Sequence, residues 1–369
     1  MPAFESPNFP LLPNAAALRA QIESQGLGQV TGLNLFSYSS CTPAIQVTLQ
    51  GGARRKVVVR GAQQNDLEWS PAKAISLEKE IRTLHRLRAG GLNVPEVLSG
   101  AAPLSVPGRD SRTNRSRPFR FYVMGFVPGT AVDRRIRHSK QTEQIYYISR
   151  IAAIYARLHR TVGPGFGIMD AAGQPASHFL ADTFERFLPA NFEEKCAIVC
   201  AHADADIGAA VRHWAANRVP RVLEFLASSG YQAKPCLVLY DGSAGNMLVS
   251  GRRIGVIDIA LTGYFDPTME FCSFFHALRD ILLENYRDGS IWDLFADRYR
   301  DAGGTLPPDR VLWALIHLGQ MILQLHNLVY NATHHNPARR NRLREVAGAI
   351  GRLVEIDNPT SHRLAAALS

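Results

Sequence analysis

The chain has 369 residues, of which 46% are hydrophobic and 20% are charged, a composition that is typical of a globular protein and excludes a disordered one. It is too long for one simple core, so we expect two lobes or domains. The formal net charge of +9 favours an anionic ligand such as a nucleotide, but the arginines stand in short pairs and form no long basic block, so we expect no nucleic-acid partner.

The cysteines and the apolar segments exclude further classes of protein. Five cysteines, odd in number and widely spaced, include no paired CxxC motif and therefore predict neither a disulfide framework nor a zinc site. The first 13 residues carry Glu5 and four prolines where an export signal needs a basic start and an apolar run. Polar side chains interrupt the most apolar stretch, residues 311–330, so we expect a packed helix there and not a membrane span. These features favour a cytoplasmic protein without a membrane partner.

The first elements along the chain are a short helix and a pair of strands. Asn14 suits the N-cap of a helix over 15–25, which two glycines end. Residues 35–60 then favour strands around a Gly-Gly turn, with a β-branched run at 57–59. This part of the chain therefore predicts the beginning of a sheet.

A second helix and a hairpin follow. Ser76 suits an N-cap, leucine and isoleucine recur at helical spacing over 77–89, and two glycines close the segment. Residues 92–127 return to strands, first in VPEVL and then in FRFYVMGFV. The polar stretch 109–117 predicts the loop of a hairpin between them.

From Pro128 onward the pattern becomes mainly helical. Residues 236–261 interrupt it with a strand pair that flanks a polar loop. The whole pattern predicts an α+β protein with a small sheet-plus-helix lobe at 1–127 and a larger, mainly helical lobe at 128–369. In the larger lobe we expect helices over 141–160, 178–188, 207–228, 266–286 and 311–330.

Oxygen-bearing side chains gather around this interruption. Asp241 and Asn246 begin and end the loop DGSAGN, and Asp258 follows the next two predicted strands, which places two carboxylates and a carboxamide at the ends of adjacent strands. Mg²⁺ prefers oxygen ligands, and a separate carboxylate can orient an attacking hydroxyl. The spacing therefore favours a site for phosphoryl transfer.

The segment LYDGSAGNMLV, followed by IGVIDIALTGYFDPTMEF, resembles the catalytic region of the aminoglycoside phosphotransferase family, whose fold is that of protein kinases. The resemblance implies that Asp241 is the catalytic base and that Asn246 and Asp258 bind Mg²⁺. It also implies a two-lobed, protein-kinase-like fold and the transfer of a phosphoryl group from ATP to a hydroxyl of a small molecule.

The resemblance extends into the small lobe. A family member carries a basic residue on its third strand, which contacts the nucleotide phosphates and pairs with a glutamate of the following helix. Arg60 and Glu80 resemble that pair, although Lys56 lies close enough along the strand to be an alternative to Arg60.

Two further segments resemble nucleotide-binding parts of the family. FYVMGFVPG resembles the linker between the lobes, so backbone groups from Met124 to Phe126 are expected to hold the adenine. The phosphate-covering loop is expected near FSYSSCT, which lacks glycine, and there Ser39 and Ser40 could supply hydroxyl and backbone N–H donors.

Three residues around the loop are expected to support it. Asp266 precedes a proline at a predicted helix start and suits an N-cap, while the resemblance implies that Asp266 and Glu270 brace the catalytic loop. His159 stands at a helix end before a glycine-rich loop, where a structural hydrogen bond is favoured over a catalytic role.

The sequence leaves the activity and the acceptor open. Leu239-Tyr240 replaces the His-Gly pair that the family has before its catalytic aspartate, so a catalytically inactive, nucleotide-binding regulatory module is the alternative to an enzyme. Phosphorylation of proteins is disfavoured because no long activation loop fits between Asp258 and Asp266. The acceptor could be an antibiotic, an amino alcohol or a sugar, and the sequence does not reveal the oligomeric state.

Overall fold

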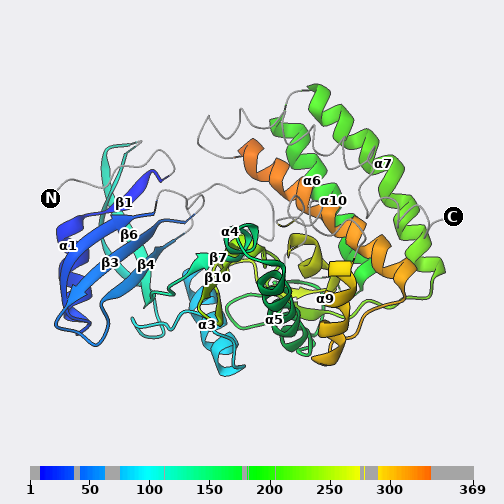
Figure 1. The fold of residues 1–369 in the computed structure, drawn as a ribbon. Coiled ribbons are helices and arrows are strands. Elements are labelled where there is room, and N and C mark those ends of the chain that lie inside the picture. Colours follow the sequence, from blue (N-terminus) through cyan, green and yellow to red (C-terminus); the bar gives the residue numbers. More distant parts are fainter. Residues whose placement is uncertain are drawn as a thin grey trace. The chain divides into compact units, whose positions relative to one another are not determined.

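The structure, a computed structural model, divides the described part of the chain into two units (Figure 1). Described residues up to Pro128, together with Ala171–Gly173, form unit 1, and the other described residues from Gly129 onward form unit 2. The structure describes residues 9–36, 42–62, 75–111, 113–176, 181, 183–203, 205–274, 278 and 290–333.

Unit 1 is built on a six-stranded antiparallel sheet with the strand order β1-β5-β6-β4-β3-β2. Neighbours in sequence pair directly on one side, where β2, β3 and β4 form a meander, while β6 returns to lie beside β4. The strands are β1 (Leu11–Pro13), β2 (Gln29–Leu35), β3 (Ala44–Gln50), β4 (Lys56–Gly61), β5 (Leu104–Asp110) and β6 (Arg115–Gly125).

Two capped helices accompany the sheet, as the sequence predicts. Helix α1 (Ala15–Ser24) begins after Asn14, whose side chain accepts hydrogen bonds from the backbone N–H groups of residues 16 and 17 at 3.0 Å. Helix α3 (Leu77–Ala89) begins after Ser76, whose hydroxyl accepts from the backbone N–H of residue 79 at 3.1 Å. Both caps satisfy N–H groups that have no partner inside a helix.

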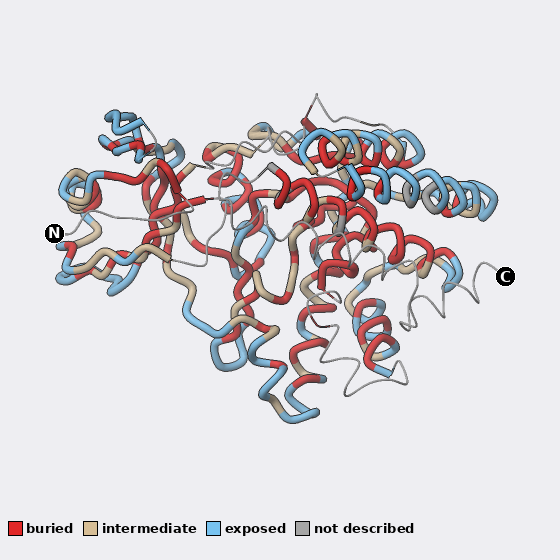
Figure 2. The backbone as a smooth tube through the Cα atoms, turned by 90° about the horizontal axis from the view of Figure 1, so that it is seen from above, coloured by how far each residue is buried: buried red, intermediate tan, exposed pale blue. Residues whose placement is uncertain are grey.

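The core of unit 1 lies between α1 and one face of the sheet. Leu18 and Ile22 of α1 pack on inward-facing strand residues such as Val57 and Val59, all of them fully buried. Alternate residues of β3 point to opposite faces, and Figure 2 shows the buried residues concentrated in the interior of the units. Each such side chain stabilises the fold by about 1.5–3 kcal/mol through burial.

The predicted hairpin in unit 1 is partly wrong. Strands β5 and β6 continue through most of the expected loop 109–117 and pair as far as Asp110 and Arg115. The strand expected at 94–98 makes only an isolated bridge between Val97 and Met124. Residues 109–117 are all polar, which is why the local pattern indicated a loop, but exposed positions of a strand can be polar as well.

Unit 2 is mainly helical, which confirms the expected α+β class. Helices α6, α7 and α10 pack side by side, and α5 packs on α9 (Figure 1). The elements are α4 (Val132–Arg137), α5 (Gln141–His159), α6 (Phe184–His202), α7 (Ala205–Ser228), α9 (Ser290–Asp301) and α10 (Asp309–Thr333).

Most helices predicted in the larger lobe are confirmed. Those expected over 141–160, 207–228 and 311–330 correspond to α5, α7 and α10. The helix expected over 178–188 is placed too early, because α6 begins at Phe184 and runs to residue 202. Residues 268–274 are helical, and most of the remaining predicted helix to 286 lies outside the described residues.

Two small sheets in unit 2 position the loop between β9 and β10. One has the order β8-β12-β9 and the other β11-β10-β7, so the loop leaves one sheet and enters another. The sequence had suggested a single strand pair around the loop, because β12 is too short to be recognised. The strands are β7 (Thr130–Ala131), β8 (Gly167–Ile168), β9 (Cys236–Val238), β10 (Met247–Ser250), β11 (Arg253–Val256) and β12 (Gly263–Phe265).

Within the described ranges, no helix is long and apolar enough to span a bilayer. The polar residues of α10 account for this in the most apolar segment of the chain.

The central strand β12 has no room for a side chain at Gly263. A Cβ there would overlap the backbone oxygen of Gly167 in β8 and lie 2.7 Å from the ring of Phe265. We predict that Gly263→Ala lowers the free energy of unfolding by about 1–3 kcal/mol, as measured by urea denaturation. The control Gly32→Ala meets only Thr48 at 3.5 Å, an ordinary contact, and is expected to change stability by less than about 0.5 kcal/mol.

Candidate active site

Three of the predicted site residues meet at one end of the β10–β11 hairpin. Asn246 directly precedes β10 and Asp258 lies two residues after β11, and the pairing of β10 with β11 brings these two ends together. The N–H of Ile257 donates to the carbonyl of Asn246 at 2.9 Å. The Asn246 Nδ2 donates in turn to the main-chain carbonyl of Asp241 at 2.9 Å, so Asn246 is bonded both to Asp241 and to the residue that precedes Asp258.

The electrostatics of Asp241 suit a proton acceptor. Burial and, to a smaller extent, the negative charge of Asp258 raise the pKa of its carboxyl to about 7, against the effect of a hydrogen bond from Asn246. Asp258 itself is exposed, whereas Asp241 is half-buried. A carboxyl group with a pKa close to neutrality can gain and lose a proton at working pH, as general acid–base catalysis requires.

Two residues at the site have an unusual backbone conformation. Tyr240 has a φ of 67° and Asp258 has a φ of 56°, in the left-handed region that favours glycine. The conformation costs a residue with a Cβ about 1–2 kcal/mol. Tyr240 stands where the family resemblance places glycine, so this chain keeps the backbone turn but has a large side chain at it.

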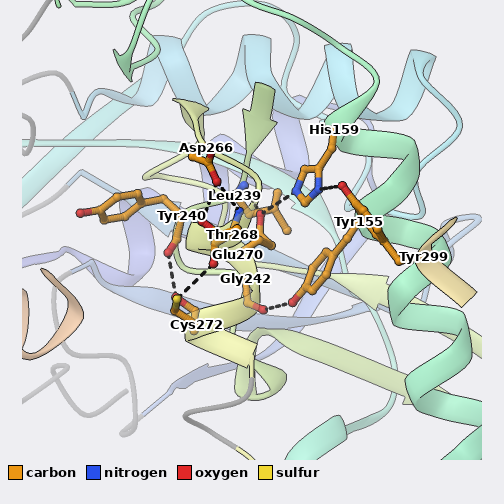
Figure 3. A network of polar contacts seen from close by, with 11 residues as sticks. Tyr155, His159, Leu239, Tyr240, Gly242, Asp266, Thr268, Glu270, Cys272 and Tyr299 are labelled. Carbon is orange, nitrogen blue, oxygen red and sulfur yellow. Dashed lines mark hydrogen bonds and ion pairs between the residues drawn. The ribbon is translucent and has the colours of Figure 1, made fainter. Parts of the chain in front are cut away.

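Glu270 supports the loop around Asp241 through hydrogen bonds to its backbone, as the resemblance implies. Its carboxylate is fully buried and its Oε2 accepts a hydrogen bond from the N–H of Leu239 at 2.6 Å (Figure 3). The N–H groups of Tyr240 and Gly242 also bond to this carboxylate. Burial raises the pKa of Glu270 to about 8, although these backbone hydrogen bonds favour the charged form.

Helix α5 holds the loop from a second side. The hydroxyl of Tyr155 donates to the carbonyl of Gly242 at 2.6 Å (Figure 3). His159 Nδ1 lies 2.9 Å from the hydroxyl of Tyr299, and its Nε2 lies 4.0 Å from Glu270. Burial lowers the pKa of His159 to about 3, so the imidazole is neutral at physiological pH. His159 thus makes a buried hydrogen bond of the kind that the sequence predicts.

Asp266 caps a helix, as predicted. Its Oδ1 accepts from the backbone N–H of Thr268 at 3.0 Å and from the Thr268 hydroxyl at 2.6 Å. Its Oδ2 accepts from the hydroxyl of Tyr231 at 2.8 Å. These contacts fix the start of the helical segment that carries Glu270.

Unit 1 contains the predicted pair of Arg60 and Glu80. Arg60 Nε donates to Glu80 Oε2 at 3.2 Å, and only 8% of the arginine and 2% of the glutamate are exposed. The hydroxyl of Tyr122 donates to the same oxygen at 3.0 Å. Lys56 is exposed and its Nζ lies 5.5 Å from the ring centre of Phe126, so the residue paired with Glu80 is Arg60 and not Lys56.

Of the other residues predicted to bind the nucleotide, the structure describes two and leaves two outside its described ranges. Met124 is half-buried in β6, where it pairs with Val58. Phe126 follows the end of β6 and is also half-buried. Ser39 and Ser40 lie outside the described residues.

Sequence reasoning missed three polar residues that hold the site. Tyr122 lies 42 positions from Glu80, and Tyr155 lies 87 positions from Gly242. The hydroxyl of Ser273 donates to the carbonyl of Tyr240 at 3.1 Å, 33 positions away. No local pattern marks such residues, because each partner comes from a different element.

The sequence profile of the phosphotransferase enzyme family matches residues 46–304, well over half of the chain. The chain belongs to this family. Membership confirms the resemblance to aminoglycoside phosphotransferases and gives the coarse reaction class, phosphoryl transfer by a kinase-type enzyme. No curated protein sequence matches the chain.

Solved structures confirm the protein-kinase-like fold of this phosphotransferase. A thermostable mutant of APH(4)-Ia in ternary complex with ADP and hygromycin B is similar with a TM-score of 0.57 and 16% identity, over 91% of this chain and 99% of that chain. The gentamicin complex of APH(2")-IIa gives 0.57 and 14%, over 96% and 99%. The GDP and kanamycin complex of APH(2")-IIia gives 0.58 and 17%, over 91% and 97%. At such identities the likeness concerns the fold alone.

The oxygen atoms around the loop of this phosphotransferase fit the magnesium that its family implies. Mg²⁺ usually binds one or two carboxylates together with substrate phosphates, and it is seldom coordinated by protein ligands alone. The donor set of Asp258 and Asn246 supplies one carboxylate and one carboxamide oxygen, which fits such a site.

The absence of a side chain at Gly242 lets the loop of this phosphotransferase lie directly against Glu270. A Cβ at this position would overlap Glu270 Oε1 and lie 2.6 Å from Glu270 Cδ. We predict that Gly242→Ala lowers the free energy of unfolding by about 1–3 kcal/mol, because Glu270 must move away from the N–H groups it binds. Thermal unfolding measures this loss. Gly245→Ala, in the same loop, meets only the Ser243 hydroxyl at 3.7 Å, and an equal loss there would contradict the explanation.

Proposed function

We propose that the chain transfers the γ-phosphoryl group of ATP to a hydroxyl of a small molecule. The observation that most supports this is the gathering of Asp241, Asn246 and Asp258 at the end of one hairpin, where Asn246 bonds to Asp241 and the charge of Asp258 acts on Asp241. A base and two oxygen donors for a cation are the parts that phosphoryl transfer needs from a protein, since most of the catalysis is positioning and charge stabilisation.

Asp241 is the proposed base. The acceptor oxygen forms a bond to the γ-phosphorus, the bond from that phosphorus to the β–γ bridging oxygen breaks, and ADP leaves with the electron pair. The Asp241 carboxylate orients the acceptor hydroxyl and takes its proton. A pKa of about 7 for Asp241 favours this role, because the group can accept the proton and return it to water at neutral pH.

Asn246 and Asp258 would hold Mg²⁺. The Nδ2 of Asn246 donates to the Asp241 carbonyl, so its Oδ1 is the atom of that side chain suited to a cation. When bound, the ion neutralises phosphate charge. Its positive charge also opposes the two causes that raise the pKa of Asp241.

Unit 1 supplies the proposed nucleotide contacts. Arg60 would bind phosphate oxygens, and Glu80, with Tyr122, fixes the guanidinium in place. Backbone groups from Met124 to Phe126 would hold the adenine, and Ser39 and Ser40 would cover the phosphates. The ADP in the similar APH(4)-Ia structure supports ATP as the donor.

The acceptor is proposed only as a class. Structures of similar fold carry hygromycin B, gentamicin or kanamycin, which supports a small molecule with hydroxyl groups. We propose that an antibiotic, an amino alcohol or a sugar binds to the helical part of unit 2. Incubating the protein with ATP, Mg²⁺ and a panel of such compounds, and looking for the mass gain of one phosphoryl group, identifies it.

The decisive variant is Asp241→Asn. We predict a fall in kcat of about 10²–10⁴, because the amide cannot take the proton, with little change in the affinity for MgATP measured by thermal shift. The control Asp297→Asn removes an exposed carboxylate of α9 and is expected to keep full turnover. A wild-type protein that responds to MgATP but phosphorylates none of the compounds in the panel would favour the inactive regulatory module instead.

A second prediction concerns the basic residue of unit 1. Arg60→Gln keeps a hydrogen-bond donor for Glu80 but removes the charge, and we expect it to weaken MgATP binding by about tenfold or more. Lys56→Gln removes an exposed charge on the same strand and is expected to change the affinity by less than about twofold. Isothermal titration calorimetry measures both. The opposite order of effects would assign the phosphate contact to Lys56.

A further inference from the structure

Tyr240 needs support from its surroundings to keep its conformation. It directly precedes Asp241, it has a φ of 67°, and 6% of it is exposed. A tyrosine avoids this backbone region unless contacts around it outweigh the strain. The orientation of Asp241 depends on the same peptide, because a relaxed φ at Tyr240 would rotate the following residue.

The side chain of Tyr240 extends from the loop into the helical layer of unit 2. Its ring centre lies 4.6 Å from that of Phe265 in β12. Its hydroxyl accepts a hydrogen bond from Lys195 Nζ at 3.2 Å. Ser273 meanwhile holds its backbone carbonyl, so the residue is fixed at both ends.

Lys195 is an unusual residue for this place. It lies on α6, it is 0% exposed, and its Nζ also faces the carbonyl of Ile322 in α10 at 3.5 Å. A buried amine costs free energy unless its donors are used. Here one amine connects α6, α10 and the loop residue before Asp241.

We propose that Lys195 is a positioning residue for the proposed base: by holding the Tyr240 hydroxyl it keeps the peptide before Asp241 in its left-handed conformation. A glycine would adopt that conformation without help, whereas a tyrosine requires an anchor for its side chain. The inference rests on the proposed function, in which Asp241 accepts the proton. It extends that function by linking the loop to the helix that carries Lys195.

The hydrogen bond does not depend on the charge of the amine. Burial lowers the pKa of Lys195 to about 7, and Glu194 opposes this effect. An amine donates whether it is charged or neutral, so the anchor persists on both sides of that pKa. The prediction therefore concerns the presence of the donor and not its titration.

The first experiment follows the loop itself in the full chain. Hydrogen–deuterium exchange is compared for wild type, Lys195→Met, Tyr240→Phe and the control Arg186→Met, which removes an exposed cation of the same helix. We expect about tenfold faster exchange in residues 239–246 for the first two variants, because losing the anchor lets the strained peptide relax. Residues 290–301 in α9 should exchange as in wild type.

The second arm repeats Lys195→Met in a Tyr240→Gly background. Glycine needs no anchor, so the lysine substitution should then add little to loop exchange, whereas a purely structural lysine would have the same effect in both backgrounds. Unchanged loop exchange in Lys195→Met, or equal effects in the two backgrounds, would overturn the proposal. If Lys195→Met does not fold, Tyr240→Phe serves in its place, because it removes the hydroxyl that Lys195 binds and keeps the ring on Phe265. Unchanged loop exchange in Tyr240→Phe would then overturn the proposal.

The third arm measures turnover of an acceptor found in the phosphorylation screen. Lys195→Met should lower kcat by about tenfold or more with the KM for ATP unchanged, because the base is displaced while the nucleotide contacts remain. A wild-type kcat in this variant would overturn the proposal. If the wild type itself transfers no phosphoryl group, the proposed function fails, and the exchange experiment alone decides the role of Lys195.

Discussion

The geometry of the loop between β9 and β10 depends on the buried carboxylate of Glu270. Its Oε2 accepts from Leu239 N at 2.6 Å, and the N–H groups of Tyr240 and Gly242 bond to the same group. The loop passes between two small sheets, so no ladder hydrogen bonds pair with these N–H groups. A buried N–H without a partner is costly, and a single carboxylate therefore fixes the backbone on both sides of Asp241. The glycine at 242 allows that approach.

Around this brace, unit 2 holds the loop through buried side chains from several helices. Tyr155 of α5 binds the carbonyl of Gly242, and Ser273 binds the carbonyl of Tyr240. Lys195 of α6 reaches the hydroxyl of Tyr240. These contacts offset the strain of a left-handed tyrosine, and they explain how this chain can lack the glycine that the family has there. Strain that the surroundings maintain is common where a side chain must be held in one orientation.

The two units use buried charge in different ways. In unit 1 the buried Arg60 and Glu80 form an ion pair at 3.2 Å, so two opposite charges lie together. In unit 2 burial raises the pKa values of Asp241 and Glu270, and a neighbouring carboxyl adds to the effect in each case: Asp258 acts on Asp241, and Asp241 acts on Glu270. Mutual repulsion of this kind favours binding of a cation, which would lower the energy of the charged forms.

The sequence by itself determined the α+β class, the capped helices after Asn14 and Ser76, and the family, because caps, helical periodicity and the DGSAGN spacing are local patterns. It also named Glu270 as the support of the loop. Only the tertiary structure decided between Arg60 and Lys56 as the partner of Glu80, and only it showed the separate sheets on either side of the loop. It alone brought Lys195 to Tyr240. These depend on strand register and helix packing between residues far apart in the chain, which no local pattern encodes.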